Sequence, residues 1–332
     1  MMIISRTPVR ISFFGGGSDY PGYFQRCLGV VLGATINKYT YVSVNTLSQF
    51  FDHKIRIGYS KTELVKNIDE IEHPSIRECL KFTGIDTHLD IHIFSDLPAK
   101  TGLGSSSSFT VGFLNALYAL RGARVSKQRL AEEACHIEQK LIKENVGSQD
   151  QFHSSFGGLN IIEFNHSSIQ VRPLIISPEK TAFLESHLMV FYTGLTRFAS
   201  DVVKEQIEKT DQKLNDEYLA KMAQMVFEAE DIIVHAQSEE MLQKLGSLLN
   251  QGWELKKKLS SKISNSLIDQ AYERAIGAGA YGGKLCGAGS GGFLAFFVKP
   301  ALQPQVKEVL KDFLQVDLRF ESSGSSIIYM KE

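Results

Sequence analysis

Several features that define common classes of protein are missing from this sequence of 332 residues. Its four cysteines are scattered, with no CxxC pair and no histidines at metal-binding spacing, which argues against a zinc site or a disulfide framework. No apolar run approaches the roughly 20 residues of a membrane-spanning helix. Arg6 and Arg10 interrupt the apolar residues near the N-terminus, so no signal-peptide core is expected there. These absences favour a cytoplasmic protein without a membrane partner.

The chain also has no excess of positive or of negative charge. The formal net charge of -1 gives no field that would gather nucleic acid or an anionic membrane. Any anionic ligand must therefore be bound by local groups, and no nucleic-acid partner is expected. Hydrophobic residues make up 43% and charged residues 22%, as in globular proteins, and the length suits two lobes. The composition leaves open whether the chain is a monomer or a homodimer.

The common nucleotide-binding motifs are absent too. The Walker A pattern GxxxxGK[ST] occurs nowhere, and the dinucleotide fingerprint fails because Ser107 stands where its third glycine would be. The HRD and DFG motifs of protein kinases are missing. These absences exclude a P-loop ATPase, a dinucleotide-binding oxidoreductase and a protein kinase.

Apolar periodicity and the positions of glycine and proline predict strands and helices in mixed order. Strands are expected at residues 1–14, 29–46, 88–98, 187–194, 293–298, 316–321 and 325–330, with a strand pair around residues 165–168. Helices are expected at residues 109–122, 127–143 and 303–314, with two or three long helices between residues 199 and 277. This order predicts an α+β fold with two lobes, residues 1–180 and 181–332.

The first glycine segment, PAKTGLGSSSS at residues 98–108, lies between a predicted strand and a predicted helix. Glycines let the backbone turn with its amides directed inward, and the helix N-terminus adds partial positive charge. Serine hydroxyls there can cap the helix or help to ligate magnesium. The segment is therefore a candidate phosphate site, although a capped helix after a tight turn would have the same composition.

Two further segments are candidates for a ligand site. The second glycine segment, residues 282–293, has six glycines in twelve residues just before an apolar strand. Close approach of a ligand or another backbone would explain so many glycines better than a simple turn. The N-terminal segment combines RTPVR, at residues 6–10, with GGGSDY, at residues 15–20. It places two cations on a strand and a carboxylate after a glycine turn.

In this order the three segments resemble the motifs of the galactokinase, homoserine kinase, mevalonate kinase and phosphomevalonate kinase superfamily. PAKTGLGSSSS is similar to its PxxxGLGSS loop and KLCGAGSGG to its C-terminal GAGGGG loop. GGGSDYP differs from the GEHTDY of galactokinases and resembles the branch that contains the heptose 7-phosphate kinases, as do GSQDQFHSSFGG (147–158) and YTGLTRFASD (192–201). The resemblance implies an N-terminal lobe like ribosomal protein S5 domain 2 and a ferredoxin-like C-terminal lobe, with ATP and substrate between them.

The resemblance also implies roles for individual residues. Phosphoryl transfer to an alcohol needs a cradle for the triphosphate, magnesium, a positioned hydroxyl and a group beside that hydroxyl. Asp150 and Arg10 would be catalytic, and Glu138 and Ser106 would bind magnesium. Nucleotide contacts are expected from Pro98, Lys100, Gly102, Leu103, Gly104, Ser105, Ser106 and Ser107. Substrate contacts are expected from Gly16, Gly17, Ser18, Asp19, Arg197, Gly287, Ala288 and Gly289.

Three of these residues have simpler structural explanations as well. Asp150 could cap a helix, Asp19 could form an Asx turn, and Arg197 could be a surface residue at a helix start. The lysines at residues 256–258 are interpreted as a solvated helix face, and Trp253 as a packing anchor.

The resemblance implies an ATP- and magnesium-dependent kinase that phosphorylates the anomeric hydroxyl of a sugar phosphate. The expected acceptor is D-glycero-D-manno-heptose 7-phosphate. The expected product is the 1,7-bisphosphate, which is used in nucleotide-sugar synthesis. Two alternatives remain: another sugar kinase of the fucokinase, galactokinase or N-acetylhexosamine kinase type, and a non-catalytic sugar or nucleotide sensor. Retention of the catalytic carboxylate and both magnesium positions argues against the sensor.

Overall fold

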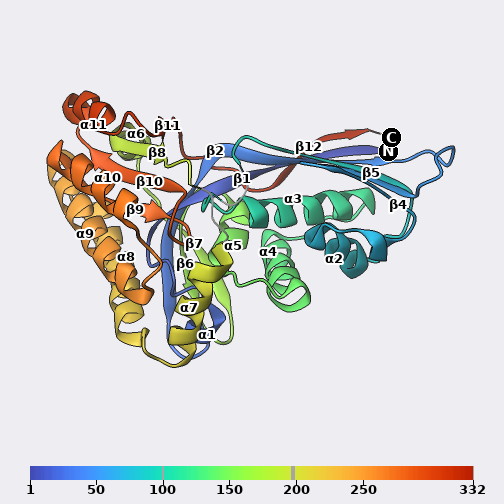
Figure 1. Cartoon of the computed structure of the whole chain (residues 1–332), viewed down its shortest axis with the longest axis horizontal. Coiled ribbons are helices and arrows are strands. Elements are labelled where there is room, and N and C mark those ends of the chain that lie inside the picture. The colour runs from blue at the N-terminus through green and yellow to red at the C-terminus, as the bar shows by residue number, and fades with distance from the viewer. Residues whose placement is uncertain (99–100, 196–198, 332) are drawn as a thin grey trace.

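The computed structural model describes residues 1–98, 101–195 and 199–331. Over these residues the chain forms an eight-stranded sheet and a four-stranded sheet. The two sheets lie toward opposite ends of an elongated molecule, each with helices packed on it (Figure 1). This arrangement confirms the predicted α+β fold with two lobes. In the described part of the chain, no helix is both long and apolar enough to span a bilayer.

The large sheet is built around two long strands, β1 (Met2–Phe14) and β2 (Gly29–Thr46). Its strand order is β12-β1-β2-β5-β3-β4, with β6 pairing with β2 and β7 pairing with β6. The other strands are β3 (Ile55–Gly58), β4 (Thr62–Val65), β5 (Leu89–Ser95), β6 (Leu159–Phe164), β7 (Ile169–Pro173) and β12 (Ser326–Lys331).

Burial changes along β1 in a way that positions the site. Side chains alternate between buried and partly exposed from Met2 to Arg6, and then all are buried from Thr7 to Phe14. Alternation is typical of a sheet with one solvated face, whereas continuous burial requires cover on both faces. The apolar residues from Val9 to Phe14 share a core with α8 (Asp216–His235) and α9 (Ser238–Leu259) of the second lobe, so the second half of β1 lies where the two lobes meet.

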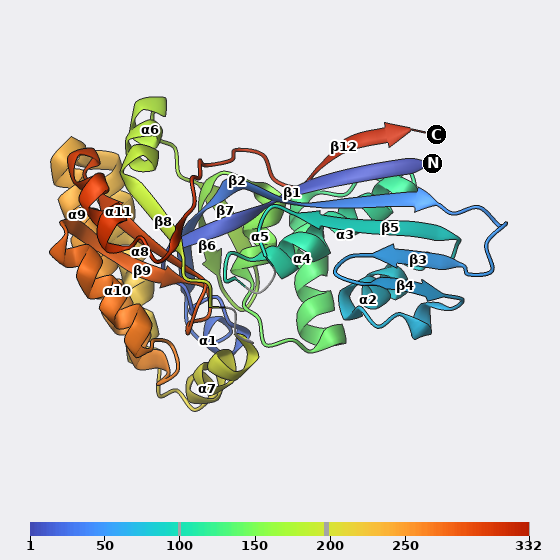
Figure 2. The same ribbon diagram turned by 45° about the horizontal axis from the view of Figure 1, so that its top comes forward.

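Helices cover one face of the large sheet, as Figures 1 and 2 show. They are α2 (Pro74–Thr83), α3 (Ser105–Leu120), α4 (Lys127–His136) and α5 (Gln149–Phe156). The short helix α1 (Pro21–Phe24) lies in the connection between β1 and β2. Helix α4 continues into a π-helical turn (Ile137–Ile142) that the sequence pattern does not predict. The apolar sides of α2, α3 and α4 form a core with β2, β3 and β5.

The second lobe holds the small sheet, in the order β11-β8-β10-β9. Its strands are β8 (Leu188–Tyr192), β9 (Ala280–Cys286), β10 (Phe293–Val298) and β11 (Leu314–Gln315). Its helices are α6 (Pro178–His187), α7 (Ala199–Asp211), α8 (Asp216–His235), α9 (Ser238–Leu259), α10 (Ser266–Gly277) and α11 (Gln303–Val309). Trp253 of α9 is buried in the apolar core of this lobe, as the packing interpretation expected.

Three predictions for this lobe are wrong. Four helices, not two or three, occupy residues 199–277, and the helix predicted to reach residue 314 ends at Val309. Residues 316–321 form no strand but a single bridge, between Phe320 and Ile36. The expectation for the second glycine segment, by contrast, is met: its first residues lie in β9, and a side chain at Gly282 would collide with the backbone of Gly246 in α9. The glycine there permits a helix to pack closely on a strand.

The C-terminus returns to the large sheet, where β12 pairs with β1 in antiparallel orientation. The two ends of the chain lie side by side in both views (Figures 1 and 2). The division into residues 1–180 and 181–332 stays a prediction. The last strand, although it follows the second lobe in sequence, belongs to the sheet of the first.

Candidate active site

The three segments picked out in the sequence meet between the lobes. The first and second glycine segments touch through Gly102 and Gly287, where the chain has φ of 85° and 90°. A Cβ at Gly102 would lie 2.7 Å from the carbonyl oxygen of Cys286 and 2.9 Å from the Cα of Gly287. Only glycine allows this approach, so contact between the two backbones explains why glycine stands at both positions.

An ion pair between a buried arginine and a partly exposed aspartate lies below this crossing. The Arg10 guanidinium, on β1, is 2.7 Å (Nε) and 2.6 Å (NH2) from Oδ1 of Asp150, in the first turn of α5. Arg10 also donates to the carbonyl of Gly102, at 2.8 Å, and its amide donates to the carbonyl of Leu103, at 3.0 Å. A Cβ on Gly104 would be 3.0 Å from Oδ2 of Asp150. Arg10 therefore holds the carboxylate directly beside the first glycine segment.

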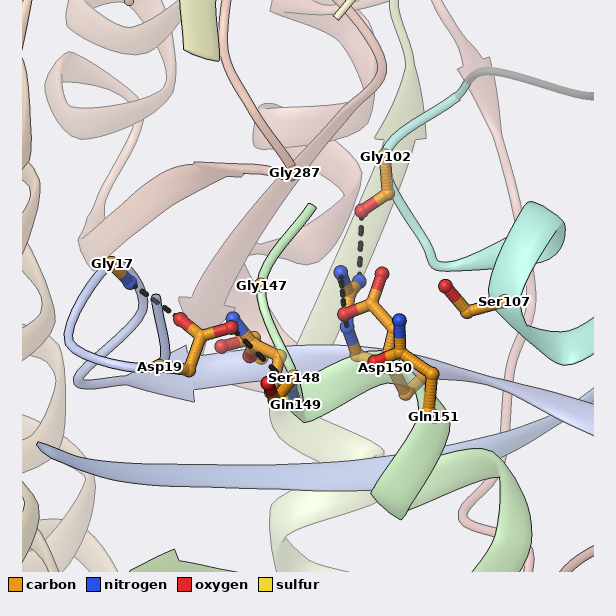
Figure 3. Close-up of polar contacts among 12 residues, drawn as sticks. Gly17, Asp19, Gly102, Ser107, Gly147, Ser148, Gln149, Asp150, Gln151 and Gly287 are labelled. Atoms are coloured by element: carbon orange, nitrogen blue, oxygen red, sulfur yellow. Dashed lines mark hydrogen bonds and ion pairs between the residues drawn. The ribbon is translucent and has the colours of Figure 1, made fainter. Parts of the chain in front are cut away.

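Asp19 forms the other end of the site, as Figure 3 shows. It is buried, and its carboxylate accepts hydrogen bonds from the amides of Gly17, at 2.9 Å, and Gln149, at 3.3 Å. Burial raises the pKa of Asp19, and the nearby charge of Asp150 raises it further. Amide donors on both carboxylate oxygens fix its orientation. Gly147 is required beside it because a side chain there would collide with the carboxylate.

Ser18, for which a substrate contact is predicted, has its hydroxyl engaged within the chain. Its side chain is fully buried, with Oγ 2.8 Å from the carbonyl of Gly15 and 3.0 Å from that of Val30, and it accepts from the amide of Val30. The hydroxyl therefore secures the turn of the N-terminal segment. Gly16, two residues before it, lies beside Ser12 and Gln149, since a Cβ there would be 3.4 Å from Ser12 Oγ and 3.7 Å from Gln149 Nε2.

Glu138 is buried at the start of the π-helical turn. Its Oε2 accepts from Ser107 Oγ at 2.8 Å and from Gln151 Nε2 at 2.5 Å, while Oε1 has no partner. Burial raises its pKa to about 7. A buried carboxylate oxygen without a partner suits a cation, and magnesium bound through one carboxylate plus nucleotide phosphates is common.

Ser107, not Ser106, lies against Glu138, and the magnesium-binding role of Ser106 stays a prediction. Ser107 donates to the carboxylate, whereas the side chain of Ser106 is exposed. Helix α3 begins at Ser105, so successive serines point about 100° apart around its axis, and motif spacing alone could not select between them. No group of three or more His, Cys, Asp or Glu side chains suited to a metal occurs among the described residues.

The other predicted residues fall into two groups. Pro98 is exposed, and Ser105, Ala288 and Gly289 are partly exposed within the two glycine segments. Lys100 and Arg197 lie outside the described residues, so the structure adds nothing on their predicted nucleotide and substrate contacts.

Sequence reasoning missed several residues of the site. Gln149 and Gln151 flank Asp150, so their position in GSQDQ was the available signal. Lys256, expected on a solvated face, is buried and donates to the carbonyl of Gly287. Lys284, within the second glycine segment, is buried and donates to the carbonyls of Ser12 and Phe13. No local pattern separated either lysine from an ordinary surface lysine.

The fold is that of small-molecule kinases. The chain is similar to a solved mevalonate kinase (TM-score 0.72, 20% identity, 96% of this chain and 99% of that chain). It is also similar to the solved galactokinase of Lactococcus lactis (TM-score 0.72, 19% identity, 98% and 95%). A solved D-glycero-D-manno-heptose 1-phosphate kinase of Bacteroides thetaiotaomicron gives a TM-score of 0.79 at 23% identity, over 99% and 100% of the chains.

Sequence comparison then identifies the family. The GHMP kinases N-terminal domain matches residues 63–158, and the GHMP kinases C-terminal domain matches residues 234–316. The D-glycero-alpha-D-manno-heptose 7-phosphate kinase of Campylobacter jejuni is 30% identical over 322 residues, which are 93% of each chain. The chain belongs to the GHMP kinase family. A bifunctional fucokinase/GDP-fucose pyrophosphorylase of Arabidopsis thaliana is 25% identical over 94% of this chain but only 31% of its own.

Proposed function

We propose that this GHMP kinase transfers the γ-phosphate of ATP to the anomeric hydroxyl of D-glycero-D-manno-heptose 7-phosphate, giving the 1,7-bisphosphate and ADP. The similarity to the Campylobacter jejuni heptose 7-phosphate kinase, which extends over 93% of both chains, carries the choice of acceptor. The Arg10–Asp150 pair beside the first glycine segment supports the chemistry.

The proposed roles are those that the family resemblance implies, and the positions of the groups support them. The amides of the first glycine segment and the N-terminus of α3 bind the triphosphate. The acceptor oxygen attacks the γ-phosphorus, the bond from that phosphorus to the β–γ bridging oxygen breaks, and ADP leaves. Asp150 orients the acceptor hydroxyl and takes its proton, while Arg10 holds Asp150 and offsets the charge of the transferred group. Asp19 accepts hydrogen bonds from sugar hydroxyls.

Magnesium fits the unpartnered oxygen of Glu138. In the proposal Glu138 holds the ion together with a serine hydroxyl at the start of α3, where Ser107 lies against the carboxylate and Ser106 is its neighbour. The ion neutralises phosphate charge when bound. The contacts predicted for Lys100 and Arg197 remain part of the proposal.

The experiment is a kinase assay with heptose 7-phosphate, heptose 1-phosphate, free heptose, fucose and galactose, with phosphorus NMR of the products. Heptose 7-phosphate should exceed the free sugar at least about tenfold in kcat/KM, since a charge-assisted hydrogen bond to phosphate is worth roughly 1.5–3 kcal/mol. Equal turnover of a neutral sugar would replace this proposal with the fucokinase or galactokinase type. Binding without turnover of any acceptor would favour the sensor.

A further inference from the structure

Glu138, the proposed magnesium ligand, is held by a residue to which the proposed function gives no role. Gln151, in the first turn of α5, donates from Nε2 to Oε2 of Glu138 at 2.5 Å. The hydroxyl of Ser107 donates to the same oxygen, at 2.8 Å. Gln151 and Glu138 are both 0% exposed, so solvent does not compete for this contact.

The two donors decide which oxygen of the carboxylate stays free. Gln151 and Ser107 both bind Oε2 of Glu138, whereas Oε1 is buried without a partner. Hydrogen bonds to an ionised acceptor are short and strong, so two of them restrict the rotation of the carboxylate. The other oxygen, Oε1, is thereby kept available for a cation.

The contact with Glu138 is also the interaction that explains a glutamine at this position. The carbonyl oxygen of the Gln151 side chain is buried and has no partner among the described residues. An apolar side chain of similar size would fill the same space without leaving a buried oxygen unpaired, and buried polar groups are normally paired. What an apolar side chain could not supply is the donor to Glu138.

Gln151 joins the metal site to the proposed catalytic group. It directly follows Asp150, which Arg10 holds. Successive residues of a helix point about 100° apart, so one turn of α5 directs Asp150 toward Arg10 and Gln151 toward Glu138. Figure 3 shows the side chains of Asp150 and Gln151 projecting together from the start of α5. The position of this turn therefore affects the catalytic carboxylate and the metal ligand together.

We propose that Gln151 is a positioning residue of the metal site, which holds Glu138 by Oε2 and leaves Oε1 free for the ion. This inference rests on the proposed function and adds to it the residue that prepares its metal ligand. Gln151 acts through Glu138 and does not itself bind the nucleotide or the sugar. The simpler alternative is structural: Gln151 would only pack α5 against the π-helical turn.

The first test uses Gln151→Met, which nearly keeps the length of the side chain but removes the donor. Gln128→Met is the matched control, because Gln128 makes the same kind of bond, to Glu132 at 2.7 Å, on the protein surface. Gln151→Met should raise the magnesium concentration for half-maximal activity by at least about tenfold, the value of a hydrogen bond to a charged group. Its KM for the sugar should change less, and excess magnesium should reverse most of the loss of activity. Gln128→Met should match the wild type.

Two results of this test would overturn the proposal. An unchanged magnesium requirement would show that Glu138 does not depend on Gln151. A loss of activity that excess magnesium does not reverse would favour the structural role, in which the variant displaces α5 and Asp150. Gln151→Leu repeats the test with a second side chain that cannot donate, and thermal unfolding checks that each variant is folded.

The second test needs no acceptor and no turnover. Calorimetry measures the Kd of the non-hydrolysable imido analogue of ATP with magnesium and with a chelator, and the ratio of the two values gives the contribution of the metal. Gln151→Met and Glu138→Gln should each lower this ratio. The double variant Glu138→Gln/Gln151→Met should lower it no further than Glu138→Gln alone, because Gln151 acts through Glu138.

The double variant separates the possible outcomes. Additive losses would overturn the proposal, since Gln151 would then act independently of Glu138. A ratio for Gln151→Met equal to that of the wild type would overturn it as well. If Gln151→Met lowers the ratio only while Glu138 is present, but no sugar phosphate is turned over by the wild type, the proposed function fails and the role of Gln151 stands.

Discussion

At the scale of single residues, Asp150 and Arg10 depend on each other. Arg10 is almost fully buried, and its guanidinium is satisfied by Asp150 and the carbonyl of Gly102. A buried cation of this kind needs its partner, and the partner is thereby held at one place beside the first glycine segment. The same contact therefore stabilises the meeting of the lobes and orients the proposed catalytic group.

Asp150→Asn tests that group. The amide keeps the size of the side chain but cannot take a proton, so kcat should fall by roughly 10² or more while ATP still binds. Asp231→Asn, which makes the same change at an exposed carboxylate, should match the wild type. Steady-state kinetics and nucleotide titration measure both. Turnover within tenfold of the wild type, with thermal unfolding unchanged, would remove Asp150 from the mechanism.

Glu138→Gln tests the metal site. The variant should need more magnesium for half-maximal activity than the wild type, with a smaller change in KM for the sugar, because only the charged oxygen favours the ion. A magnesium series at fixed ATP and sugar gives the magnesium requirement, and a sugar series at saturating ATP and magnesium gives KM for the sugar. An unchanged magnesium requirement would direct the search to another acidic residue of the same helix.

Glu138 also makes a pH-dependent prediction for the metal-free protein. Because burial raises its pKa from 4.5 to about 7, the protonated form contributes stability that is present below pH 4.5 and is lost as pH rises through 7. Gln cannot ionise, so with a chelator present Glu138→Gln should unfold at a higher temperature than the wild type at pH 8, by about 2 °C or more. At pH 4.5 the difference should be smaller. A difference that does not depend on pH would contradict the burial of the charge.

At the scale of elements, the crossing of the two glycine segments positions the nucleotide site. Gly102 and Gly287 touch through their backbones, and the carbonyl of Gly102 accepts a hydrogen bond from Arg10 at the same place. The π-helical turn after α4 has a comparable effect, since it carries Glu138 inward to Ser107. The crossing and the π-helical turn are both local departures from regular backbone structure. The first positions the carbonyl of Gly102, and the second positions the carboxylate of Glu138.

Gly102→Ala tests the crossing, with Gly122→Ala as its control. Both glycines have positive φ, of 85° and 66°, so alanine strains either backbone to a similar degree. Nothing lies within 4 Å of a Cβ at Gly122, whereas at Gly102 it would meet the backbone of residues 286 and 287. Both variants should lose a little thermal stability, but only Gly102→Ala should lose activity, by at least about tenfold for a shift of this kind. Equal kinetics for the two variants would show that the crossing is not needed.

At the scale of the whole molecule, the C-terminal segment connects elements of the first lobe through hydrogen bonds. Ser325 donates from its amide to the carbonyl of Ser154 in α5, at 2.9 Å, and its hydroxyl contacts Thr7 and Asn115, at 2.8 and 3.0 Å. These contacts join β1, α3 and α5 just before β12 pairs with β1. Helix α5 carries Asp150 at its other end, so the tail supports the site from a distance.

Removal of residues 322–332 tests this role. The truncated protein should unfold at a temperature lower by at least about 5 °C, since it loses a strand and the contacts of Ser325. Its kcat should also fall by a larger factor than its KM for ATP rises. The reason is that the truncation removes the contact of the tail with α5 and leaves the nucleotide site in place. A shorter truncation, of residues 331–332, should have little effect. Unchanged melting and kinetics after the longer truncation would contradict the role of the tail.

Much of this protein is determined by the sequence itself. The three segments, the long strands before and between them and the helix after PAKTGLGSSSS depend on turn chemistry and apolar periodicity, which act between residues close in the chain. The same local chemistry placed Asp19, Gly102 and Asp150 at turns and helix starts, which is where the structure has them.

Only the tertiary structure decided the rest. It placed Ser107 rather than Ser106 against Glu138, and it made Gly282 part of a strand. It buried Lys256 near Gly287 and Lys284 near Ser12. It also paired residues 326–331 with the first sheet. Each of these outcomes depends on which distant residue fills the space beside a group. Local sequence sets the path of the backbone over a few residues, whereas the packing of elements far apart in the chain decides which of their side chains are buried and paired.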